Sequence, residues 1–239
     1  MISYRIPSVQ LNQSQEHLPL NMVQFKESSV DAKTEFIPLE MLYIFEHDRQ
    51  IKVIERPINH NISQYLVTAA PKLASGFKYS VRAGQATSAK LLADNVLPNQ
   101  AGRDAFLADL DFLSDLYFDL IACPQVSLRV EVLNTAMCPK FHVDKTGIRM
   151  LCTYQGQGTQ WLDDQYANRA KLGIASGNLD DSQSGLILDT QAVHVVPAFA
   201  IALLKGSLWQ GNHMRGIIHR SPSVLDNSPR VLLAIDAIW

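Results

Sequence analysis

A His-x-Asp pair in a β-rich stretch is the first pattern in the sequence with the residue types for metal chemistry. His142 and Asp144 are two positions apart, and residues at this spacing in a β-strand point to the same face. They therefore offer one metal ion an imidazole nitrogen and a carboxylate oxygen. A third ligand must come from elsewhere, and His219, in the segment GIIHRSP at the end of a β-rich run, is the best candidate.

Two histidines and one carboxylate on one face of an octahedron leave the other coordination positions open. This arrangement is typical of non-haem iron(II) oxygenases. Arg230 follows His219 by eleven residues and begins the apolar run VLLAID. Its guanidinium is a two-pronged donor that matches a carboxylate and stays charged at physiological pH. We therefore expect Arg230 near the metal, facing the far carboxylate of a dicarboxylic keto acid.

The HVD triplet, the HRSP segment and Arg230 together resemble the HxD…H…R pattern of the Fe(II)/2-oxoglutarate-dependent dioxygenase superfamily. The segment RMLCTYQGQGTQWL is similar to the strand and turn that follow the HxD motif. The segment VVPAFAIALLKG is similar to the strand before the distal histidine, although Ala198 or a neighbour stands in place of the glycine. The similarity covers about residues 126–236, and the whole chain resembles an uncharacterised bacterial domain family that shares this core.

The resemblance implies that His142, Asp144 and His219 bind Fe(II). The co-substrate would be 2-oxoglutarate, chelating the iron through its C1 carboxylate and keto oxygen, with its C5 carboxylate bound by Arg230. The implied reaction is oxidative decarboxylation to succinate and CO2, coupled to hydroxylation or demethylation of an unidentified small molecule or peptide.

The resemblance also implies a further hydrogen bond to the C5 carboxylate. Tyr154 or Thr153, on the strand after the HxD motif, is the residue that we expect to donate it. Arg149 enters the same apolar strand, where it would bind substrate or co-substrate, or form a structural ion pair.

Alternative ligand sets remain open. His194 is followed eleven residues later by Lys205, a spacing that mimics the arrangement described above. Cys138 and Cys152 flank the HxD motif, and thiolate with imidazole ligands would favour zinc over iron. The alternative functions are thus a non-catalytic zinc-binding or metal-homeostasis protein on the same barrel, and a cupin-like isomerase or ligand-binding protein without oxygen chemistry.

The elements that must position these residues change type along the chain. Residues 43–58 contain two β-rich runs around the polar stretch HDRQ and predict a hairpin or a pair of short strands. Helical patterns follow at residues 62–73 and 85–95, and an apolar stripe at three- and four-residue steps predicts a third helix ending before Pro124. Short strand-like runs then occupy residues 126–133, 148–154, 185–189, 192–197, 200–205, 216–219 and 231–235.

This order of elements, together with the resemblance, predicts an α+β fold: a double-stranded β-helix (a jelly-roll or cupin-like barrel) buttressed by N-terminal helices. Residues 1–35 are rich in Gln, Asn, Ser and Glu and are expected to form a loosely ordered N-terminal extension. Residues 36–239 would form a single catalytic domain, with residues 36–125 as a mostly helical buttress and residues 126–239 as the β-barrel core.

The bulk properties narrow the classes of partner. A net charge of −2 without a Lys/Arg run gives no reason to expect nucleic acid or an anionic membrane as partner. The first residues lack the pattern of a secretory signal, and no stretch approaches the roughly 20 apolar residues of a membrane span. Three widely spaced cysteines, Cys123, Cys138 and Cys152, do not resemble a disulfide framework, so we expect a cytoplasmic protein.

Overall fold

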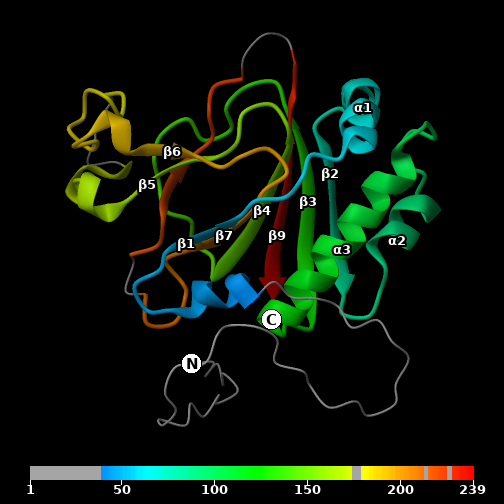
Figure 1. Ribbon diagram of the computed structural model, residues 1–239, viewed down its shortest axis with the longest axis horizontal. Coiled ribbons are helices and arrows are strands. Elements are labelled where there is room, and N and C mark those ends of the chain that lie inside the picture. The colour runs from blue at the N-terminus through cyan, green and yellow to red at the C-terminus, as the bar shows by residue number, and fades with distance from the viewer. Residues whose placement is uncertain (1–38, 174–178, 213–214, 225–227) are drawn as a thin grey trace. The chain divides into compact units, whose positions relative to one another are not determined.

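Two antiparallel β-sheets and a group of helices make up the described part of the chain (Figure 1). The computed structural model describes residues 39–173, 179–212, 215–224 and 228–239. The extension expected over residues 1–35 lies outside the described residues. The architecture is mixed α/β, and within the described residues no helix is long and apolar enough to cross a membrane.

The strands form one large and one small sheet. They are β1 (Ile51–Ile54), β2 (Gly76–Arg82), β3 (Gln125–Leu133), β4 (Ile148–Gln155), β5 (Gln160–Leu162), β6 (Val193–Val195), β7 (Ile201–Lys205), β8 (Ile218–Arg220) and β9 (Arg230–Ile238). The six-stranded sheet has the order β1-β7-β4-β9-β3-β2, and the three-stranded sheet has the order β6-β5-β8. All of these neighbouring pairs are antiparallel.

Helices α1 (His60–Ala69), α2 (Thr87–Ala93) and α3 (Arg103–Ile121) lie together beside the large sheet (Figure 1). Short 3-10 helices are η1 (Leu39–Phe45), η2 (Ala70–Lys72), η3 (Asp164–Tyr166), η4 (Arg169–Lys171) and η6 (Thr190–Ala192). Helix α3 ends when Ala122 adopts a left-handed conformation with φ 54° and donates its N–H to Phe118 O, 2.8 Å away. Pro124 follows, in accord with the expected end of the helix.

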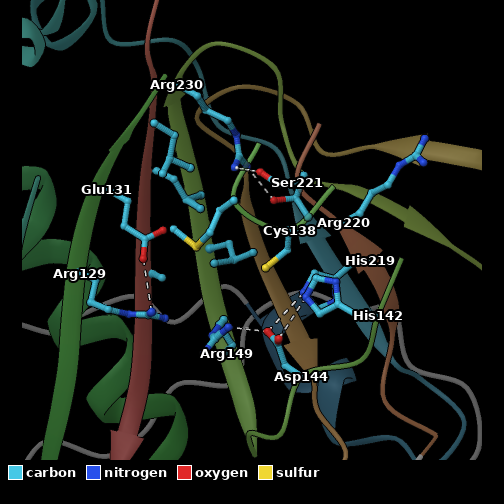
Figure 2. Close-up of a pocket in the computed structure, with 16 residues that line it drawn as sticks. Arg129, Glu131, Cys138, His142, Asp144, Arg149, His219, Arg220, Ser221 and Arg230 are labelled. Atoms are coloured by element: carbon cyan, nitrogen blue, oxygen red, sulfur yellow. Dashed lines mark hydrogen bonds and ion pairs between the residues drawn. The ribbon is translucent and has the colours of Figure 1, made fainter. Parts of the chain in front are cut away.

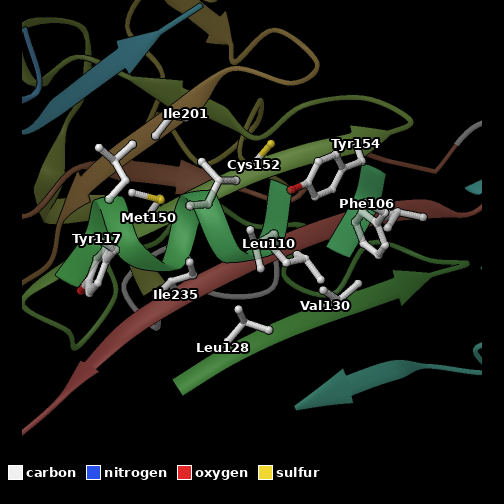
Figure 3. Close-up of a cluster of buried hydrophobic side chains, with 14 of the residues drawn as sticks. Phe106, Leu110, Tyr117, Leu128, Val130, Met150, Cys152, Tyr154, Ile201 and Ile235 are labelled. Carbon is white, nitrogen blue, oxygen red and sulfur yellow. The ribbon is translucent and has the colours of Figure 1, made fainter. Parts of the chain in front are cut away.

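The main hydrophobic core lies between α3 and one face of the large sheet (Figure 3). Apolar residues at three- and four-residue steps put Phe106, Leu110 and Tyr117 on the buried side of α3. The hydroxyl of Tyr117 donates to Ile148 O at 2.6 Å and accepts from Ala237 N at 3.0 Å. Tyr117 therefore ties α3 to both β4 and β9.

The opposite face of the large sheet packs against the small sheet. Alternation along β4 turns Met150, Cys152 and Tyr154 toward the helices, whereas Leu151 belongs to a second core between the sheets. In that second core Val196, Ile217 and Trp161 meet small and aliphatic residues of β4, β7 and β9 (Leu151, Ala202, Leu204, Leu232 and Ala234). The two faces of β4 thus look into two separate environments.

Of the hairpin or pair of short strands expected over residues 43–58, only one strand forms, β1. Residues Leu39–Phe45 form the 3-10 helix η1, in which Met41 and Ile44, three positions apart, are the buried residues. Strand β1 pairs instead with β7, with Ile51 opposite Leu204. The long-range partner β7 outcompetes a local one because it places β1 at the edge of a large sheet with a packed face.

Two further differences concern strands. Residues 185–189 form no strand, but only an isolated bridge between Ala167 and Ile187. The bridge cannot extend into a strand because Ala167 lies between the 3-10 helices η3 and η4. Strands β2 and β5 were not expected from the sequence. The alternation of Phe77, Tyr79 and Val81 is the period-two signal that marks β2.

Candidate metal centre

His142, Asp144 and His219 converge at one end of a cavity between the sheets (Figure 2). Each offers one ligand atom, and these atoms all lie within 4.8 Å of one another. Nε2 of His142 is 3.3 Å from Asp144 Oδ1, and Nε2 of His219 is 3.3 Å from Asp144 Oδ2. We call these three residues the triad.

Backbone pairing brings the two histidines together. His142 lies outside a regular strand, but it forms an isolated antiparallel bridge with His219 of β8, with both N···O distances at 3.0 Å. Nδ1 of His142 is 2.9 Å from Lys140 O, and Nδ1 of His219 is 3.1 Å from Ile217 O. Each Nδ1–H can donate to its carbonyl, so Nε2 of each ring faces Asp144, where it can donate a hydrogen to the carboxylate or, in the neutral ring, offer a lone pair to a metal ion.

The backbone of Asp144 is fixed by the turn after β7. Its carbonyl accepts hydrogen bonds from Ser207 N at 2.8 Å and Ser207 Oγ at 3.1 Å. A Cβ on Gly206 would lie 2.4 Å from Thr146 O, so the close approach of the two loops requires glycine there. The triad thus combines the segment after β3 with strand β8, and the turn after β7 holds Asp144 in place.

The electrostatics keep the carboxylate ionised. Burial by itself raises the pKa of Asp144, but hydrogen bonds from both histidines and the charge of Arg149 outweigh it, so the pKa falls well below its usual value. The pKa of His142 is raised, chiefly by its hydrogen bond to Asp144. One carboxylate and two imidazoles form a donor set that fits a divalent transition metal such as iron(II).

The far end of the same cavity contains a buried arginine. Arg230 is 2 % exposed. Nε donates to Gln157 O at 2.7 Å, Nη2 to Thr159 Oγ1 at 2.9 Å and Thr153 Oγ1 at 3.2 Å, and Nη1 to Ser221 Oγ at 3.2 Å. All four acceptors are uncharged, and no carboxylate among the described residues forms a salt bridge with Arg230. Burial lowers the pKa of Arg230 to about 10.

The cavity between these two ends has a volume of about 90 Å³. The triad lines one end, and Arg230, Thr159 and Ser221 line the other. The lining between them combines apolar residues of β3, β4 and β9 (Leu133, Leu151, Leu232 and Ala234) with charged residues (Arg129, Glu131, Arg149 and Arg220). An elongated anion with one end at the triad and the other at Arg230 matches this distribution of polar groups.

The structure brings His142, Asp144, His219, Arg230 and Thr153 to this region, but not Tyr154. The hydroxyl of Tyr154 donates to Asp109 Oδ2 of α3 at 2.6 Å, and its ring packs edge-on against Phe106 and Phe199. Since Thr153 and Tyr154 are adjacent in β4, they face opposite sides of the sheet. A role of Tyr154 in binding the co-substrate therefore has no geometric basis.

The alternative ligands lie apart from the triad. His194 stacks on Trp161 with ring centroids 4.2 Å apart, and Lys205 donates to Glu46 O at 2.6 Å. Cys152 is buried on the helix side of the large sheet. Cys138 lines the cavity, but within the described part of the chain the group of potential metal ligands contains no thiol.

The sequence did not single out Thr159, Ser221 or Asp236. Ser221 follows His219 by two positions, so the same period-two argument that joined His142 to Asp144 could have found it. Asp236 accepts two hydrogen bonds from Arg149, at 2.7 and 2.9 Å. This contact favours the ion pair over the substrate contact that the sequence left open for Arg149.

A family model described as a protein of unknown function, DUF1826, matches residues 38–236. The chain belongs to the DUF1826 family. No curated protein matches this DUF1826 sequence.

Solved structures with similarity include several oxygenases. The iron-bound HygX from Streptomyces hygroscopicus is 10% identical with a TM-score of 0.44, covering 85% of this chain and 88% of HygX. A Pseudomonas putida prolyl-4-hydroxylase is 12% identical with a TM-score of 0.31, covering 72% of this chain and 97% of the hydroxylase.

The rice dioxygenase for auxin oxidation is 16% identical with a TM-score of 0.39, covering 68% of this chain. The match spans 55% of that plant enzyme and 64% of its Arabidopsis thaliana counterpart. These TM-scores are low, so the function proposed for this DUF1826 protein is based on the contacts within its own chain.

Proposed function

We propose that the protein is a non-haem Fe(II)/2-oxoglutarate-dependent oxygenase that hydroxylates or demethylates a small molecule or peptide. In this proposal the two sheets form a double-stranded β-helix, residues 36–239 act as one catalytic domain, and the N-terminal helices buttress the large sheet. Fe(II) would be held by His142, Asp144 and His219, and the distal carboxylate of 2-oxoglutarate by Arg230.

One observation carries the proposal: a buried cation without a carboxylate partner among the described residues shares a cavity with the triad. An isolated buried charge is costly unless it is paired. A carboxylate between Arg230 and a metal would neutralise the guanidinium and accept a charge-assisted hydrogen bond from Nη1, one N–H of which takes part in none of the contacts given above. The carbon chain of such a ligand would pass the apolar residues between the two ends of the cavity.

Each group of the protein then has a defined task. The triad holds the metal and leaves part of its coordination sphere open. Arg230, positioned by Gln157, Thr153 and Thr159, orients the dicarboxylate, and the apolar residues between the two ends contact its carbon chain. The bound iron and 2-oxoglutarate would supply the oxidising chemistry.

The test compares two histidines by metal and co-substrate binding. Calorimetry under anaerobic conditions would measure Mn(II) binding, then 2-oxoglutarate binding to the Mn(II)-loaded protein. We expect His219→Ala to abolish both, and the matched control His194→Ala to preserve both. Turnover of 2-oxoglutarate to succinate should in turn require Fe(II).

Two outcomes contradict the proposal. One is a wild-type protein that binds Mn(II) but not 2-oxoglutarate. The other is a natively bound zinc ion that is lost in Cys138→Ser, because Cys138 lines the cavity and a thiolate site would support the alternative of a non-catalytic zinc-binding protein.

A further inference from the structure

Arg149 joins the triad to a second carboxylate behind it. Its Nη1 donates to Asp144 Oδ2, while Nε and Nη2 donate to the two oxygens of Asp236 at 2.7 and 2.9 Å. Arg149 on β4 lies directly opposite Asp236 on β9 in the strand register. The guanidinium is therefore anchored by two parallel hydrogen bonds on a rigid sheet and offers its remaining nitrogen to the triad.

The contact belongs to a row of alternating charges across β4, β9 and β3, which we call the charge ladder. Asp236 also accepts from Arg129 Nη2 at 3.1 Å, and Arg129 Nη1 lies 3.3 Å from Glu131 Oε1. The order is Asp144, Arg149, Asp236, Arg129 and Glu131, with side-chain exposures between 15% and 26%. Figure 2 shows the two ends of the ladder beside the cavity.

We propose that Arg149 is a positioning residue, anchored by Asp236, that holds the Asp144 carboxylate in the orientation required for metal binding. This inference rests on the proposed metal site. A carboxylate with free rotation about its side-chain bonds must lose that freedom when it binds a metal, whereas one held by a fixed guanidinium has lost it already. Asp236 also balances the charge of Arg149, which limits its repulsion of a nearby divalent ion.

If Arg149 acted only through its charge, its removal would change the metal affinity in the opposite direction. The guanidinium is a cation next to a cation site, so its removal would strengthen metal binding if charge alone mattered. If positioning dominates, its removal weakens metal binding, and groups that orient metal ligands typically contribute about 10- to 100-fold in affinity. The direction of the change in affinity therefore separates the two roles.

The experiment measures the Kd for Mn(II) by calorimetry and the absorption spectrum of the Co(II)-loaded protein, together with urea unfolding of the metal-free protein. Arg149→Met should raise the Kd about 10- to 100-fold and alter the Co(II) spectrum. Arg129→Met is the matched control, because it removes another arginine that lines the cavity and pairs with Asp236 but does not touch Asp144. We expect its Kd and Co(II) spectrum to match those of the wild type.

Arg149→Lys covers the case in which Arg149→Met does not fold. An ammonium group keeps the charge but lacks the planar fork that spans Asp144 and Asp236, so a weaker Mn(II) affinity is again expected. The inference is overturned if the substituted proteins that fold bind Mn(II) as tightly as the wild type or more tightly, or if Arg129→Met weakens binding equally. A wild type that binds no metal would instead contradict the proposed function itself.

Discussion

The substitution Arg230→Met is expected to change the stability of the protein little and its affinity for 2-oxoglutarate strongly. The reason is that this arginine is buried without a carboxylate partner among the described residues. Burial lowers its pKa from 12.5 to about 10, which corresponds to about 3 kcal/mol of unfavourable free energy in the charged form. Methionine removes this term. It also leaves Gln157 O without its donor, which costs about 1–3 kcal/mol. The two effects oppose each other, so we expect the free energy of unfolding to change by less than about 2 kcal/mol.

In contrast to stability, the binding of 2-oxoglutarate should become much weaker in Arg230→Met. Loss of the guanidinium–carboxylate contact removes an ion pair with a charge-assisted hydrogen bond, which contributes about 1.5–3 kcal/mol. A loss of about 3 kcal/mol, the upper end of this range, raises the Kd roughly 100-fold. Calorimetry with the Mn(II)-loaded protein measures the Kd, and urea unfolding of the same samples measures stability.

Arg220→Met is the matched control, since Arg220 lines the same cavity but is paired. It donates to Asp181 Oδ2 at 3.0 Å and to Gln160 Oε1 at 2.7 Å. The Asp181 carboxylate is buried, whereas the Arg220 side chain is 25% exposed. Removing Arg220 leaves this buried carboxylate without its cation, which costs about 3 kcal/mol, so we expect a larger loss of stability than for Arg230→Met and a nearly unchanged Kd. The reasoning is refuted if Arg230→Met binds 2-oxoglutarate like the wild type, or if it loses as much stability as Arg220→Met.

Two further predictions test the helix side of the sheet and a buried lysine. Tyr154→Phe should lower the free energy of unfolding by about 1.5–3 kcal/mol, because it removes a hydrogen bond to the Asp109 carboxylate; a weaker 2-oxoglutarate affinity in this protein would contradict the placement. Burial lowers the pKa of Lys205 to about 8, so between pH 8 and pH 10 the unfolded chain binds more protons than the folded one, and the stability of the wild type relative to Lys205→Met should rise with pH. Urea unfolding at several pH values checks this, and a constant difference would exclude it.

The sequence predicted the meeting of the triad and Arg230 because two simple rules apply there. A spacing of two residues joined His142 to Asp144, and the residue types of His219 and Arg230 left few alternatives. The rules work although His142 lies in an isolated bridge and not in a strand, since an extended backbone also alternates its side chains.

The same period-two rule separates Thr153 from Tyr154. The sequence left open which of the two donates to the co-substrate, and adjacent residues of a strand face opposite sides. Which side faces the cavity depends on where α3 packs, and that contact is not encoded within the strand. The hairpin failed for a related reason: β1 pairs with β7 about 150 residues away, and a local pattern cannot specify so distant a partner.

The pairing of the arginines around the cavity distinguishes charges that the fold itself compensates from one that a ligand would compensate. Arg129 and Arg149 share Asp236, and Arg220 pairs with Asp181, so the fold itself compensates these charges. Arg230 is the most deeply buried of the four, at 2 % exposure, and among the described residues it has only neutral acceptors. A buried cation without a carboxylate partner does not stabilise the fold, and methionine could occupy the same space. An anionic ligand would compensate the charge of Arg230, and the triad at the other end of the cavity indicates where the rest of that ligand would bind.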